Sequence, residues 1–164
     1  MGFSERARRA NDVMLEYGKD MRQLMKLNKQ LHELAREINC PPSVQAMKYG
    51  WGAGGKGGNR SSVVERFALR KERLQKRYNT LDKPFRELER KTSWAGIKIA
   101  QLHNDHHDDG LLYAYYVANQ KVGDIAKQYG YSAVGCIERI VYLLENVIPK
   151  IFTGDGDYSI TYPD

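Results

Sequence analysis

The chain has 164 residues, a formal net charge of +6 and 28% charged residues. This length allows one domain, or a small domain with a helical arm, and the composition fits a compact enzyme with a deep pocket poorly. No apolar run approaches the ~20 residues that a membrane span needs, and the positive charge suits a polyanionic partner.

Cysteine content and the first residues indicate an intracellular setting. Cys40 and Cys136 are the only cysteines, and they lie far apart in the sequence. Cys136 falls on an apolar helical face, where a free thiol behaves as a small hydrophobic group. The charged N-terminus has no signal-peptide core, so we expect a reduced, cytoplasmic protein.

Residues 4–39 predict one long helix with a coiled-coil-like apolar stripe. Asn28 interrupts this stripe at an a position, where a lone buried Asn fixes register and strand number. We therefore expect residues 1–40 to form an oligomerisation arm, with a homodimer favoured. The alternative is that the stripe packs within the same chain. The self-association residues are Met14, Tyr17, Met21, Leu24, Asn28, Leu31 and Ile38.

Residues 41–61 predict a flexible linker, because Pro41 and Pro42 end the helix and glycines follow. Gly50 to Lys56 has the spacing of a phosphate-binding loop. However, a glycine replaces the magnesium-binding hydroxyl and no strand precedes the loop, so a nucleotide site is not expected. Two interpretations of the linker stay open: it holds Lys56 and Arg60 near the phosphates of a nucleic acid, or it is an inert connector.

The middle of the chain predicts basic helices. From Lys48 to Tyr78 there are nine Lys or Arg residues against two Glu, whereas from Leu111 to the end there are four against six acidic residues. Ser62 begins a capping box that opens a helix, and Asp82 with Pro84 is typical of a new helix start. The phosphate-contacting candidates on this stretch are Arg66, Arg70, Arg73 and Arg77.

A cluster of His and Asp residues occupies residues 103–109. Ligands on such closely spaced residues do not converge easily without a rigid scaffold, so we expect no metal site. The cluster predicts a polar turn in which Asp108 or Asp109 caps the next helix. No arrangement of a nucleophile with a base is present, and we expect neither an enzyme nor a cofactor.

A helix-turn-helix unit is predicted at residues 122–142. Ala126 is small where two helices cross, Gly130 allows the left-handed turn, and Ser132 caps the second helix. Cys136 and Ile140 then return at helical spacing to the core. The expected organisation is an all-α fold with a helical domain at 62–150 and a tail at 151–164, whose residues from Thr153 onward are either frayed or loosely docked.

The stretch from Leu111 to Leu144 resembles the region-four helix-turn-helix of sigma factors. With the basic helix and Gly-rich loop before it, residues 49–144 are similar in layout to the ArpU/RinA-type late-gene regulators of phages and prophages. This resemblance implies an activator that binds double-stranded DNA in the host cytoplasm and contacts RNA polymerase. Two other functions stay open: a small terminase subunit, and a protein that acts on RNA polymerase without binding DNA.

The resemblance places the second helix of the unit in the major groove. Arg139 is the only cation on that helix, so phosphate attraction has to come from elsewhere. The alternative is that this helix docks another protein. The DNA-binding candidates are Lys121, Lys127, Ser132, Ala133, Val134, Gly135, Ile137, Glu138 and Arg139.

Overall fold

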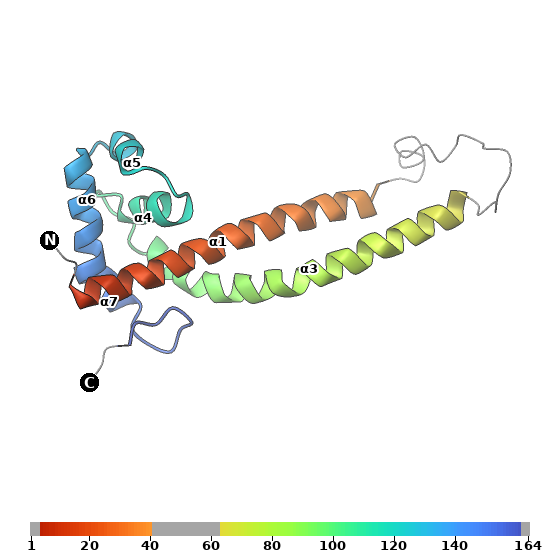
Figure 1. Cartoon of the computed structure of the whole chain (residues 1–164), viewed down its shortest axis with the longest axis horizontal. Coiled ribbons are helices and arrows are strands. Elements are labelled where there is room, and N and C mark those ends of the chain that lie inside the picture. The colour runs from red at the N-terminus through yellow and green to blue at the C-terminus, as the bar shows by residue number, and fades with distance from the viewer. Residues whose placement is uncertain (1–3, 41–62, 162–164) are drawn as a thin grey trace. The chain divides into compact units, whose positions relative to one another are not determined.

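The computed structural model describes residues 4–40 and 63–161, and within these residues the regular secondary structure is all helical, with no strand, which confirms the all-α prediction (Figure 1). The predicted linker with Lys56 and Arg60, and the capping Ser62, lie outside the described residues. None of the described helices is long and apolar enough to cross a membrane. The elements are α1 (Glu5–Ile38), α3 (Val63–Ala100), α4 (Asp108–Leu112), the π-helical turn η1 (Tyr113–Val117), α5 (Val122–Tyr129), α6 (Ala133–Tyr142), the π-helical turn η2 (Leu143–Val147) and α7 (Ile148–Ile151).

The chain divides into two compact units, which cut across the predicted arm and helical domain. Unit 1 comprises residues 1–24 and 87–164, and unit 2 comprises residues 25–86. Each of the two long helices therefore contributes one part to each unit.

Unit 1 holds the hydrophobic core, and the N-terminal part of α1 is built into it. Ala7, Ala10 and Met14 are fully buried there, together with apolar residues of α3 and of the helices after residue 107. Tyr17 packs edge-on against Tyr158, with ring centroids 5.6 Å apart. Two members of the predicted self-association stripe, Met14 and Tyr17, are thus packed within the chain. This agrees with the alternative interpretation, in which the stripe packs inside the same chain.

Helix α1 approaches the C-terminal helices tightly at Gly18. A Cβ atom at this position would collide with the carbonyl group of Tyr116 in η1. One turn later, Arg22 Nη1 donates to the same carbonyl oxygen at 2.5 Å. Carbonyl groups near a helix end lack intrahelical partners, and the guanidinium supplies one. The glycine therefore allows the contact and the arginine stabilises it.

The described part of the C-terminal tail is docked in unit 1, which agrees with the docked alternative and not with the frayed one. Phe152 and Tyr158 are fully or almost fully buried, and the Ile160 N–H donates to the Phe152 carbonyl at 2.7 Å. The Tyr158 hydroxyl donates to Asp20 Oδ2 at 2.5 Å. Lys91 Nζ lies 2.7 Å from the same carboxylate. The composition of the tail, which is rich in Gly and Asp, does not reveal these contacts, because their partners lie far away in the sequence.

The helix start predicted at Asp82 and Pro84 is also wrong, because α3 continues through Pro84. An interior proline removes one hydrogen bond and costs about 3 kcal/mol in an isolated helix. Here the division between the two compact units falls shortly after the proline, between Arg86 and Glu87. Asp82 does not cap a helix but pairs with Arg86 at 2.6 Å.

In unit 2 the second part of α1 packs with the first part of α3. Leu27, Leu31 and Leu34 are buried, whereas Asn28 is exposed. Asn28 therefore lies beside the buried stripe and is not the buried, register-setting residue that was predicted. Across the unit, Arg70 Nη2 of α3 donates to Glu37 Oε2 of α1 at 2.9 Å.

We predict that Gly18→Ala lowers the free energy of unfolding by about 1–3 kcal/mol, because the added methyl group forces α1 and η1 apart. The matched control is Gly123→Ala in α5, where an added Cβ meets no atom within 4 Å. That change should raise stability by up to about 1 kcal/mol through helix propensity. Urea unfolding measures both, and a stabilised Gly18→Ala protein would contradict the α1–η1 contact.

Candidate nucleic-acid interface

Local chemistry sets the turn between α5 and α6 as predicted (Figure 1). Gly130 ends α5 in the left-handed conformation, with φ 72° and ψ 26°. Its N–H and that of Tyr131 both donate to the Ala126 carbonyl, the latter at 2.8 Å. Ser132 then caps α6, with its Oγ accepting from Gly135 N at 2.9 Å. Residues 130–132 thus supply hydrogen-bond partners for a free carbonyl group at the end of α5 and a free N–H group at the start of α6.

The inner face of this helix pair joins the core of unit 1. Ile125 and Ala126 of α5 and Cys136 and Ile140 of α6 are all buried. Burial raises the pKa of the Cys136 thiol, so this group stays neutral and packs as a hydrophobic side chain. The predicted helix-turn-helix packing is confirmed at each of these positions.

The outer face of α6 is exposed but carries little charge. Among the DNA-binding candidates, Gly135 and Arg139 are half-buried and the others are exposed. The exposed fraction is 66% for Val134 and 49% for Ile137. Lys121 and Lys127 lie at the two ends of α5. The exposed candidates of this face are Lys121, Lys127, Ser132, Ala133, Val134, Ile137 and Glu138.

Arg139 is the exception, because it is held by an acidic partner within unit 1. Its Nε and Nη2 donate to the two carboxylate oxygens of Asp108, each at 2.7 Å. The Tyr142 ring lies 5.0 Å from the guanidinium carbon. A bidentate pair uses the donor geometry that a guanine contact would need. A base contact by these donors of Arg139 would therefore have to displace the Asp108 carboxylate.

Asp108 itself is only 3% exposed and does not act as a helix cap. The cap position of α4 is His107, in the left-handed region with φ 56°, and it lacks a side-chain cap bond. Asn104 Nδ2 donates to Asp108 Oδ2 at 2.7 Å. Burial raises the pKa of Asp108, but the hydrogen bonds from Arg139 and Asn104 outweigh it and leave that pKa below its ordinary value.

The other His and Asp residues of the 103–109 cluster form a polar turn. His103 Nδ1 lies 3.1 Å from Asp109 Oδ2, and the His107 ring contacts the Tyr129 ring at 5.4 Å. Among the residues that the structure describes, no three His, Cys, Asp or Glu side chains come together as metal ligands.

Four arginines of α3 form a positive surface on unit 2. Arg66, Arg73 and Arg77 are exposed, and Arg70 is half-buried beside Glu37. All four line one surface hollow together with Leu69 and Leu74. Their spacing of four, three and four residues places them on one face of the helix.

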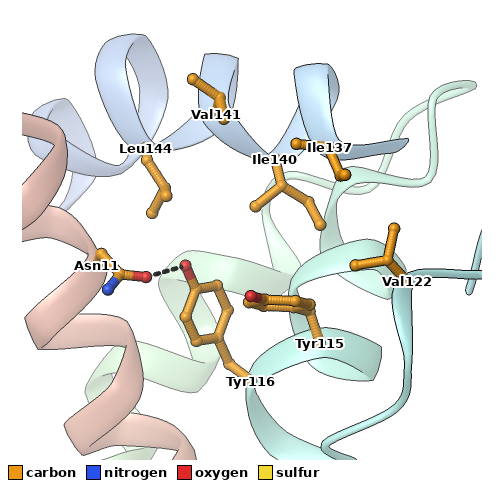
Figure 2. Close-up of a pocket in the computed structure, with 8 residues that line it drawn as sticks. All are labelled: Asn11, Tyr115, Tyr116, Val122, Ile137, Ile140, Val141 and Leu144. Atoms are coloured by element: carbon orange, nitrogen blue, oxygen red, sulfur yellow. Dashed lines mark hydrogen bonds between the residues drawn. The ribbon is translucent and has the colours of Figure 1, made fainter. Parts of the chain in front are cut away.

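A feature that sequence reasoning missed is a small pocket behind α6, framed by η1 and η2 (Figure 2). Tyr115 and Tyr116 were not among the predicted site residues. A π-helical turn shifts the helical phase and often marks a functional site, but no residue pattern announces it. The lining residues are Asn11, Tyr115, Tyr116, Val122, Ile137, Ile140, Val141 and Leu144.

Comparison of the chain with protein-family models, with curated proteins and with solved structures gave no match.

We predict that Asp108→Asn lowers the free energy of unfolding by about 1–3 kcal/mol, because it removes the charged partner of the partly exposed Arg139 guanidinium. The control is Asp109→Asn, which makes the same change at a more exposed carboxylate. Its cost should stay below about 1 kcal/mol.

The same pair of variants tests the acid response. The folded-state pKa of Asp108 lies below its unfolded value of about 3.9. The contribution of Asp108 to the free energy of unfolding is complete above its unfolded-state pKa and is lost as the pH falls through its folded-state pKa. Chemical unfolding between neutral and acidic pH should show this loss in the native protein and Asp109→Asn, but not in Asp108→Asn. An equal acid response in all three proteins would refute the role of the pair.

Proposed function

We propose that the protein is a DNA-binding transcription regulator of the phage type. The observation that carries this proposal is the α5–α6 unit, in which Gly130 turns the chain and Ser132 caps an exposed α6. Helix-turn-helix proteins present the first turns of the second helix to the major groove. The ArpU/RinA resemblance supports the finer assignment to late-gene activation and contact with RNA polymerase.

The arginine face of α3 supplies the electrostatic part of DNA binding in this proposal. Phosphate contacts provide most non-specific affinity and its salt dependence, and they need flexible or forked cations on an accessible surface. Arg66, Arg73 and Arg77 meet this requirement, since each is exposed on one helix. With Arg139 held by Asp108, α6 offers no such group.

The first turn of α6 supplies shape rather than charge. Ala133 and Val134 are exposed there, and small apolar side chains contact the methyl group of thymine in the major groove. Sequence preference therefore rests on apolar contacts and on groove shape. Self-association through the stripe of α1 is not part of the proposal, because Met14, Tyr17 and Leu31 are buried within the chain.

We predict that the triple variant Arg66→Gln, Arg73→Gln, Arg77→Gln weakens binding to duplexes of any sequence. If each arginine neutralises one phosphate, the slope of log K against log salt falls by about 3. This set spares the Arg70–Glu37 pair, so that α1 and α3 remain connected. Fluorescence anisotropy with a random-sequence duplex at several salt concentrations measures the slope.

The charge-matched control replaces Lys19, Lys26 and Lys29, three exposed lysines of α1, with Gln. It removes the same three charges and should leave the slope nearly unchanged. An equal effect of the two triple variants would show that only net charge matters. If the native protein binds no duplex at low salt, the proposal fails.

A further inference from the structure

The only cation of α6 is Arg139, and a carboxylate from another helix holds its guanidinium. The Nε and Nη2 atoms, here called the Arg139 fork, donate to the two oxygens of Asp108 at 2.7 Å each. The Arg139 side chain is 23% exposed, whereas that of Asp108 is 4% exposed. The arginine thus reaches the surface of unit 1, but its fork is turned toward a buried acceptor.

The carboxylate of Asp108 is fixed on its own side of this contact. Asn104 Nδ2 donates to Asp108 Oδ2 at 2.7 Å. Asp108 belongs to α4, and α4 packs tightly on α5, because a Cβ atom at Gly110 would lie 2.6 Å from the hydroxyl oxygen of Tyr129. The carboxylate therefore cannot follow Arg139 if the arginine turns toward a ligand.

The balance of free energies keeps the Arg139 fork on Asp108. A base contact by these donors would exchange the buried carboxylate for the O6 and N7 atoms of guanine. A buried carboxylate that loses its cation costs more free energy than one bidentate base contact returns. Asn104 supplies one neutral donor and does not replace the lost charge. The fork is therefore withheld from DNA, although it lies on the helix that faces the groove in the proposed function.

Without this fork, the first two turns of α6 have no side-chain donor with which to read guanine. The exposed side chains there are apolar at Ala133, Val134 and Ile137, and the carboxylate of Glu138 only accepts hydrogen bonds. Guanine presents two acceptors in the major groove, which none of these side chains can bind. Thymine presents a methyl group, which the apolar side chains can contact.

We infer that Asp108 is a specificity-determining residue that withholds the Arg139 fork from DNA, so that α6 reads the methyl groups of thymine and does not read guanine. Asp108 acts through Arg139 and does not itself touch DNA, so it is a positioning residue. The inference rests on the proposed function, because it assigns the base preference of that same α6 surface.

Selection of bound duplexes from a random-sequence pool, followed by sequencing, measures this preference in the full chain. We expect the native protein to select sites without a required guanine. Asp108→Asn releases the Arg139 fork, so its selected sites should gain a required guanine. On duplexes that differ only at that base pair, Asp108→Asn should prefer guanine by about tenfold, whereas the native protein should show no such preference.

Two further variants separate the arginine from other effects. Asp109→Asn makes the same change of charge one residue away, at a carboxylate paired with His103, and it should select the native sites. The double variant Asp108→Asn, Arg139→Met removes both charges, which a buried pair tolerates better than the loss of one. This variant should also select the native sites, and it tests the silence of Arg139 even if Asp108→Asn alone is unstable. Circular dichroism and thermal unfolding show which variants are folded.

The inference is overturned if folded Asp108→Asn selects the native sites, or if Asp109→Asn or the double variant gains the same guanine. It is also overturned if the native sites require a guanine that the double variant loses, since Arg139 then reads a base without leaving Asp108. If the native protein binds no duplex from the pool, the proposed function fails and the inference falls with it. Native binding without the guanine shift refutes the inference alone.

Discussion

The contact between Gly18 and the carbonyl group of Tyr116 determines how unit 1 is assembled. Because glycine has no side chain, the backbone of α1 approaches η1 closely enough for Arg22 to bind the same carbonyl. Seven residues earlier, Asn11 accepts from the Tyr116 hydroxyl. Tyr116 is thereby held from α1 at both its backbone and its side chain, and it forms the floor beneath α6. The candidate sites of unit 1 therefore depend on the first part of α1.

The buried pair of Asp108 and Arg139 sets the chemical character of α6. Both carboxylate oxygens are occupied by the guanidinium, and Asn104 adds a third donor. A buried pair of this kind contributes modest net stability but is costly to break, because one charge is then left uncompensated. The consequence for function is that the one arginine of α6 is used inside the protein. What α6 presents outward is apolar and acidic.

Two surfaces of opposite character result, one in each compact unit. The α3 surface of unit 2 is rich in arginine and suits phosphate groups, whose affinity depends on salt. The α6 surface of unit 1 is apolar at Val134 and Ile137 and acidic at Glu138, and it lies beside the small pocket. In the proposed function the first surface supplies charge and the second supplies shape.

The sequence by itself determined the features that depend on neighbours within a few residues. Helix periodicity, the left-handed Gly130 and the Ser132 cap were all predictable, because propensity, turn geometry and capping are local effects. The tertiary structure decided which apolar side chain is buried and which charge is neutralised. Leu27 is buried where Asn28 was expected, and Arg139 meets a carboxylate 31 residues away. Such choices arise from packing between distant segments, whose complementary shapes and charges leave no periodic trace in the chain.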